Sequence, residues 1–201
     1  MLLQVGLFIY PEVEVLDFAG PFEVFSTASR VHARTSPQAP APFAPSLVAE
    51  TREPVRARGG LAVLPHFAID GHPPLDVLIV PGGVHDPELG KPQVLSWIAR
   101  QHASTRLTAS VCTGAFLLAA AGLLDGLEVT THFEDAADLR RAFPGTRVLE
   151  GVRFTEGERI MTSAGISAGL DMSLRVVARF AGQDLAERTA RQMDYDWRKR
   201  A

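Results

Sequence analysis

Residues 107–122 read LTASVCTGAFLLAAAG, an apolar run that is broken near its middle by a cysteine, a threonine and a glycine. The part up to Val111 has the length and composition of a buried strand. The part from 113 to 121 is rich in small apolar residues, as in a buried helix, and Gly122 supplies a common helix end. These residues therefore predict a strand that turns sharply into a helix, with Cys112 at the turn.

A cysteine at such a junction is a candidate nucleophile. The small residue Gly114 permits a tight turn, as in the nucleophile elbow of hydrolases, and the thiol would face the amide N–H groups of the helix start, which stabilise a thiolate. We therefore expect Cys112 to be a nucleophile whose pKa lies below the ordinary value of about 8.5. The alternative is a buried structural cysteine, which is among the commonest core residues.

Strands and helices alternate along the rest of the chain. Expected strands cover 2–10, 43–50, 75–80, 106–111, 129–132, 146–149, 152–155 and 159–162, with a short hairpin within 55–69, and expected helices cover 21–30, 86–102, 113–121, 134–143, 166–181 and 184–197. This alternation predicts an α/β fold with a mainly parallel sheet that helices cover on both faces, formed by one domain over 1–201. Sites in such folds lie at the carboxyl ends of the strands.

An acidic residue stands in the apolar segment that follows the first expected strand. Asp17 lies between Leu16 and Phe18, just before Gly20-Pro21, where we expect a loop, with the helix beginning only after Pro21. A carboxyl group among apolar residues needs a partner or a raised pKa. If Asp17 reaches Cys112, the pair would share a proton, the carboxyl would stay protonated, and it could act as an acid. The alternative is that Asp17 caps a turn or a helix.

Three further residues follow expected strands. Gly82 and Gly83 follow Pro81 at the end of the strand 75–80, and their amide N–H groups could form an oxyanion hole or simply make a turn. His132 ends the strand 129–132 and could serve as a base for Cys112, or could be bonded to the backbone. The six histidines lack the spacing of metal ligands, so we expect no metal site.

The composition excludes several classes of protein. With 20 Lys+Arg and 23 Asp+Glu, the net charge of −3 argues against a nucleic-acid partner, which favours a basic face. The single cysteine excludes an intramolecular disulfide and a zinc site made of several thiolates, and it fits a reducing compartment. The N-terminus lacks the charge pattern of a signal peptide, and the longest apolar run is too short to span a membrane. We therefore expect a cytoplasmic protein.

Seven motifs together resemble the ThiJ/PfpI superfamily, which is related to the class I glutamine amidotransferases. They cover 11–13, 16–21, 81–83, 110–115, 120–126, 130–132 and 162–171. The likeness extends from about residue 4 to about residue 195, and so many motifs in this order are specific for the superfamily. Within it, an early Asp and a Thr directly after the nucleophilic Cys are typical of the branch that hydrates isonitriles, and Asp17 and Thr113 match both features.

The resemblance implies a flavodoxin-like three-layer sandwich with a cysteine nucleophile elbow. It also implies a homodimer with sites near its interface, a small-molecule substrate and no cofactor. In the implied reaction, Cys112 attacks the terminal carbon of an isonitrile and Asp17 supplies a proton, which gives a covalent thioimidate. Water oriented by Asp17 and Thr113 then releases an N-substituted formamide, while N–H groups near Gly83 and Thr113 hold the developing negative charge.

Two other functions fit the same motifs. Transcriptional regulators of the AraC type carry an amidase-like domain with nearly the same run around the cysteine, followed by a helix-turn-helix pair, so the chain could be a ligand sensor without catalytic activity. It could also be another cysteine hydrolase of the superfamily. We expect no helix-turn-helix pair within these 201 residues.

Overall fold

The computed structural model describes residues 1–199, so the last two residues of the expected domain lie outside the described part. Its centre is a seven-stranded sheet in the order β10-β11-β7-β6-β1-β2-β5. The strands are β1 (Leu3–Phe8), β2 (Phe43–Ala49), β5 (Phe67–Ala68), β6 (Val77–Val80), β7 (Leu107–Val111), β10 (Phe154–Glu156) and β11 (Ile160–Ser163). All neighbours pair in parallel except β10 and β11, which are antiparallel. The mainly parallel sheet is therefore confirmed.

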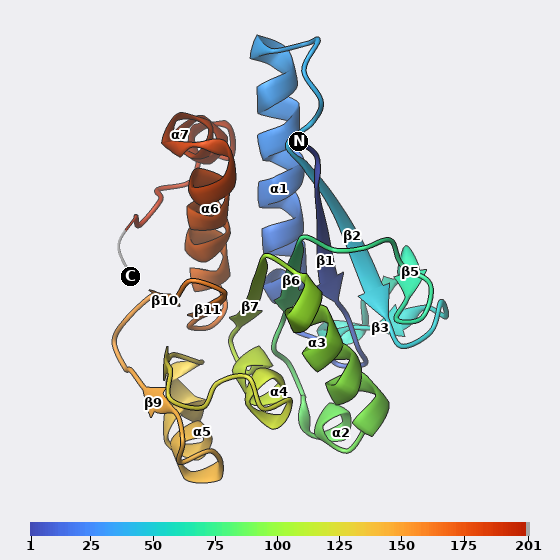
Figure 1. The fold of residues 1–201 in the computed structure, drawn as a ribbon, viewed down its shortest axis with the longest axis vertical. Coiled ribbons are helices and arrows are strands. Elements are labelled where there is room, and N and C mark those ends of the chain that lie inside the picture. Colours follow the sequence, from blue (N-terminus) through green and yellow to red (C-terminus); the bar gives the residue numbers. More distant parts are fainter. Residues whose placement is uncertain (200–201) are drawn as a thin grey trace.

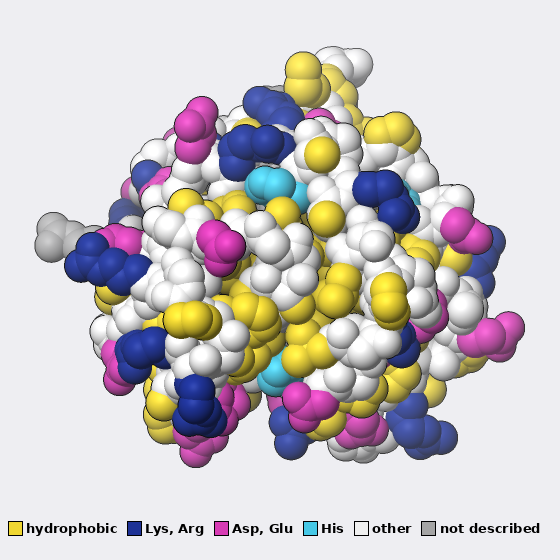
Figure 2. Space-filling model, turned by 60° about the horizontal axis from the view of Figure 1, so that its bottom comes forward, with side chains coloured by type: hydrophobic (Ala, Val, Ile, Leu, Met, Phe, Trp, Pro, Cys, Tyr) yellow, Lys and Arg dark blue, Asp and Glu magenta, His cyan; other side chains and the backbone are white. Residues whose placement is uncertain are grey.

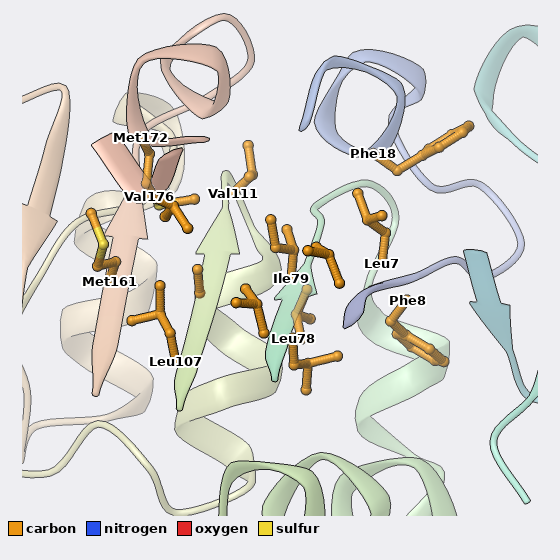
Figure 3. Close-up of a cluster of buried hydrophobic side chains, with 14 of the residues drawn as sticks. Leu7, Phe8, Phe18, Leu78, Ile79, Leu107, Val111, Met161, Met172 and Val176 are labelled. Atoms are coloured by element: carbon orange, nitrogen blue, oxygen red, sulfur yellow. The ribbon is translucent and has the colours of Figure 1, made fainter. Parts of the chain in front are cut away.

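Helices cover both faces of this sheet (Figure 1). The helices are α1 (Val15–Thr35), α2 (Asp86–Leu89), α3 (Pro92–Ser104), α4 (Gly114–Ala120), α5 (Ala136–Ala142), α6 (Ala168–Ala181) and α7 (Gln183–Gln192). Figure 3 shows the layers: α1 and α6 lie on one side of the strands, α3 and α4 on the other, and buried side chains such as Leu78, Leu107 and Val176 fill the space between them. Because every residue of the central strands β6 and β7 is buried, both faces of the sheet are covered and the sandwich has three layers.

Smaller elements complete the chain. The expected hairpin within 55–69 is formed by β3 (Val55–Arg56) and β4 (Ala62–Val63), with the short helix η1 (Arg58–Gly60) between them. The expected strand 129–132 is mostly wrong: only β8 (Glu128–Val129) forms, and it pairs with β9 (Arg147–Val148) in a separate two-stranded sheet. Thr130 to His132 then run as extended chain to η2 (Phe133–Asp135), which precedes α5.

The expectation that a helix begins only after Pro21 is wrong. Helix α1 starts at Val15 and continues through Pro21 to Thr35. A proline inside a helix removes one backbone hydrogen bond, here the bond to the carbonyl of Asp17, and typically costs ~3 kcal/mol. Burial of Phe18, Val24 and Phe25 on the sheet offsets this cost. Asp17 therefore lies in the first turn of a helix and not in a loop.

Two helix ends also differ from expectation. The expected helix 86–102 is divided into α2 and α3 at Gly90-Lys91, and a proline stands near the start of each part. Helix α7 ends at Gln192 and not at 197. The segment after it folds back on α6, where Trp197 Nε1 donates a hydrogen bond of 3.2 Å to the carbonyl of Asp171.

Candidate active site

Cys112 occupies a sharp turn between β7 and α4. Its φ of 56° is rare for a residue other than glycine and marks a strained position. Its N–H donates to the carbonyl of Ser163 at 3.1 Å, and its own carbonyl accepts from Thr131 Oγ1 at 2.8 Å. These bonds hold the backbone in the strained conformation, so the elbow expected from the sequence is present.

Two glycines make room for this turn. A Cβ at Gly114 would collide with the carbonyl oxygen of Val80 at the end of β6. A Cβ at Gly82 would lie 2.6 Å from the Thr113 nitrogen and 2.8 Å from the Cys112 Cβ. Glycine is therefore required at both positions for the elbow to pack against the end of β6.

Asp17 reaches the same place from helix α1. It is 0% exposed, and its Oδ2 accepts a hydrogen bond of 3.1 Å from the Gly82 N–H, while its Oδ1 has no hydrogen-bond partner among residues 1–199. Burial raises the pKa of Asp17 to about 7, and the nearby Glu14 carboxylate adds to the rise. A helix cap would instead accept from an N–H of its own helix. Asp17 is therefore a buried carboxyl group aimed at the elbow.

The expectation of a lowered thiol pKa is wrong. Burial raises the pKa of Cys112 well above its ordinary value, and the charge of Asp17 raises it further, while the N–H of Thr113 only partly offsets both. The seven-residue helix α4 therefore does not outweigh desolvation. The raised pKa of Asp17 agrees with the expectation that this carboxyl group holds its proton to higher pH than a free Asp does.

Gly82 is hydrogen-bonded to Asp17, and Gly83 is hydrogen-bonded to Thr113. The Gly82 N–H is donated to Asp17, and the Gly83 N–H is donated to Thr113 Oγ1 at 3.0 Å. The Thr113 hydroxyl in turn donates to the Gly83 carbonyl at 3.0 Å. The two glycine N–H groups expected to form an oxyanion hole are thus engaged within the protein, whereas the N–H of Thr113 faces the sulfur.

His132 lies on the opposite wall. Its Nδ1 is 3.4 Å from Asp135 Oδ2 and accepts a long hydrogen bond, also 3.4 Å, from the Glu134 N–H. A Cβ at Gly165 would collide with the His132 ring and lie 3.1 Å from Cys112 Sγ. Gly165 therefore lies between the imidazole and the thiol, and only a residue without a side chain fits there.

A cavity of about 360 Å³ joins these residues at the carboxyl ends of the strands, on the face that Figure 2 turns forward. Cys112, Thr113, Gly83 and His132 line it, whereas Gly82 and Asp17 lie behind the wall. Several other residues line the cavity without a sequence motif that predicts them, among them Glu14, Arg58, His85, Asp135 and Ile166. Of these residues, only Asp135 could have been found from the sequence, because its position three residues after His132 allows the contact between the two side chains.

A second cavity, of about 650 Å³, lies between β8 and the β10–β11 hairpin. It is larger than the cavity at Cys112, but its walls are mainly apolar and contain neither a cysteine nor a serine. The candidate nucleophile Cys112 and the carboxyl group with a raised pKa lie elsewhere, so we take the smaller cavity as the candidate site.

Among residues 1–199, no group of three or more His, Cys, Asp or Glu side chains is arranged to hold a metal ion. Within the same range, no helix combines the length and the apolar character needed to cross a membrane.

Comparisons with known proteins agree with this architecture. The chain is 33% identical to the isonitrile hydratase of Pseudomonas putida over 198 residues, which cover 97% of this chain and 79% of the hydratase. It is 34% identical over 143 residues to the HTH-type transcriptional regulator GbdR of Pseudomonas aeruginosa, and that match covers 71% of this chain but only 38% of the regulator.

Among solved structures, a ThiJ/PfpI family protein from Pseudomonas syringae superposes with a TM-score of 0.83 at 29% identity, over 96% of this chain and 75% of that chain. The sequence profile of the DJ-1/PfpI family matches residues 4–179. The chain is therefore a member of the DJ-1/PfpI family.

Proposed function

We propose that the protein is an isonitrile hydratase that works through a covalent cysteine intermediate. One observation carries this proposal: the strained elbow brings the Cys112 thiol beside a buried carboxyl group, Asp17, whose pKa is raised to about 7 and whose Oδ1 accepts no hydrogen bond within the described part of the chain. A group with a pKa near neutrality can both accept and return a proton. The likeness to the hydratase of Pseudomonas putida supports the choice of substrate.

In the first step the ionised Asp17 takes the thiol proton as the sulfur attacks the terminal carbon of R–N≡C. Asp17 then returns this proton to that carbon, which gives the thioimidate R–N=CH–S–Cys112. The N–H of Thr113, at the start of α4, stabilises negative charge on the sulfur and on the attacked carbon. The ionised carboxylate is required to begin the reaction, so activity rises with pH through about 7.

In the second step water adds to the thioimidate carbon. Asp17 takes one proton from the water and passes it to the nitrogen, which gives R–NH–CH(OH)–S–Cys112. The proton of the new hydroxyl group then passes through Asp17 to the sulfur as the C–S bond breaks and the C=O bond forms. The product R–NH–CHO holds all the atoms of the isonitrile and of one water molecule. For the Thr113 hydroxyl to orient this water, it must exchange one of its two bonds to Gly83.

Incubation with cyclohexyl isocyanide and detection of N-cyclohexylformamide tests this proposal. We expect turnover by the wild-type protein and none by Cys112→Ala. Formation of formamide at the same rate by both proteins, or by neither, would contradict the proposal.

A second candidate function is a ligand sensor without turnover. The engaged N–H groups of Gly82 and Gly83 favour it, because they leave few free donors for an oxyanion. The regulator relatives also favour it. Saturable binding of a small molecule without formation of product would support this function.

We also propose that the protein forms a homodimer and has no affinity for DNA. Light scattering during size exclusion tests the homodimer, and a search for salt-dependent binding to duplex DNA tests the second part.

A further inference from the structure

The cavity at Cys112 is bordered by charged side chains that are mostly acidic. Four carboxylates and one guanidinium line it, together with two imidazoles: Glu14, Asp86, Glu134, Asp135, Arg58, His85 and His132. With neutral imidazoles, negative charge therefore exceeds positive charge at the entrance to the thiol.

These charges differ in how far they act. The side chains of Glu14 and Asp135 are 26% and 35% exposed, so water screens them only in part. Asp86 and Glu134 are mostly exposed at the rim and contribute less. The single cation, Arg58, has a mostly exposed side chain and lies 3.7 Å from Glu14 Oε2, so one of these carboxylates already balances its charge.

The acidic side chains also act on the thiol itself. The charge of Asp135 contributes to the raised pKa of Cys112, which shows that its field reaches the sulfur. The same field must act on any charged group that a ligand carries into the cavity. An anion entering it would meet Asp135 and the charge of Asp17 behind the elbow, with only Arg58 in compensation.

We infer that this cavity admits neutral and cationic molecules and discriminates against anions, so that the substrate is an isonitrile with a neutral or ammonium-bearing substituent. The isonitrile part of this inference rests on the proposed function. The charge selectivity does not, because it concerns access to the thiol alone.

Cys112 is the only cysteine of the chain, so it can be labelled selectively. Two methanethiosulfonate reagents of similar size, one with a trimethylammonium group and one with a sulfonate, measure the selectivity. In each reaction the Cys112 thiolate attacks the sulfenyl sulfur, an S–S bond forms and methanesulfinate leaves. The ratio of the two rates cancels the intrinsic reactivity of the Cys112 thiol, because both reagents react with the same group. Division by the same ratio for 2-mercaptoethanol at pH 8 corrects for the different reactivities of the two reagents.

We expect a ratio of roughly ten in favour of the cation at low salt, falling towards one at about 1 M salt. Asp135→Asn should lower the ratio several-fold. Glu158→Gln removes an exposed carboxylate beside the other cavity and should leave it unchanged. A wild-type ratio of one or less, or an equal response to both variants, would overturn the inference.

Hydration assays with an ammonium-bearing, a neutral and a carboxylate-bearing isonitrile of similar size separate this inference from the proposed function. We expect kcat/KM to be lowest for the carboxylate. A labelling ratio near ten without hydration of any isonitrile would contradict the proposed function and leave the charge selectivity standing. Hydration of the carboxylate at least as fast as of the others would contradict the substrate class.

Discussion

Asp17 and Asp171 each lie in the first turn of a helix, α1 and α6 respectively, and both are 0% exposed. Asp171 is fully bonded: its Oδ2 accepts from Arg153 Nε at 2.8 Å, and its Oδ1 accepts from Tyr195 Oη at 3.1 Å and from the Arg198 N–H at 2.9 Å. Within the residues that the structure describes, Asp17 accepts one hydrogen bond, at Oδ2, and its Oδ1 has no partner.

The difference between these two regions separates stability from chemistry. A buried carboxylate with a cation and several donors is stable in its charged form and holds the structure together. A buried carboxylate with few donors is costly to ionise, so it titrates near neutrality and remains available to move protons. On this comparison, Asp171 holds the segment after α7 against α6, whereas Asp17 has the properties that the proposed reaction requires.

The largest expected effect concerns the nucleophile beside Asp17. Cys112→Ala removes the sulfur that forms the covalent intermediate, so we expect hydration to fall to the background rate. Circular dichroism and urea denaturation should show an intact fold, because alanine fills most of the same space. Residual hydration close to the wild-type rate would show that the thiol does not react.

Asp17→Asn should reduce kcat by a factor of ~10²–10⁴, because it removes the group that transfers the proton. The same change should stabilise the fold at pH 8 by ~1–3 kcal/mol, because the buried site no longer has to hold a charge. Steady-state kinetics and urea denaturation measure the two effects. A loss of both activity and stability would mean that Asp17 is structural, like Asp171.

Asp171→Ala should have the opposite effect on stability to Asp17→Asn. It leaves the partly buried Arg153 without its partner, so we expect a loss of ~3 kcal/mol in the free energy of unfolding. Glu187→Gln is the matched control, since it breaks the exposed pair with Lys199 in the same segment and should cost less than ~1 kcal/mol. Equal losses in both variants would remove the distinction between the two regions.

The pH dependence of stability should differ between wild type and Asp17→Asn. Burial raises the pKa of Asp17 in the folded state above its unfolded value of about 3.9, so the folded state binds more protons between these values. Its contribution to stability is complete below pH ~4 and is lost as the pH rises through about 7. Urea denaturation from pH 4 to 9 should show the difference, and parallel curves would contradict it.

The smallest effect concerns Tyr195, whose hydroxyl donates to Asp171. Tyr195→Phe removes one donor of several, so we expect a loss of ~1–1.5 kcal/mol without a change in kcat. Denaturation and kinetic measurements together check this prediction, and a fall in kcat would link the segment after α7 to the reaction.

The sequence predicted the sheet and the elbow because both depend on local patterns. The apolar strands and the small residues around Cys112 are visible within a few positions of each other. Pro21 misled the prediction of α1, because its cost is offset by burial that only the folded chain provides.

The thiol pKa could not be predicted for a similar reason. It depends on burial and on Asp17, which the fold brings from another helix. Likewise, the bonds of Asp171 join α6 to Arg153 and to the segment after α7, and no local pattern indicates them.

Infrared difference titration of the wild-type protein against Asp17→Asn and Cys112→Ala tests the central claim, which is the location of the shared proton. The protonated carboxyl of Asp17 and the single S–H group absorb in separate regions, so both can be followed. We predict that the carboxyl band disappears with a midpoint near pH 7 while the S–H band persists to higher pH. Loss of the S–H band near neutrality while the carboxyl stays protonated would contradict the account.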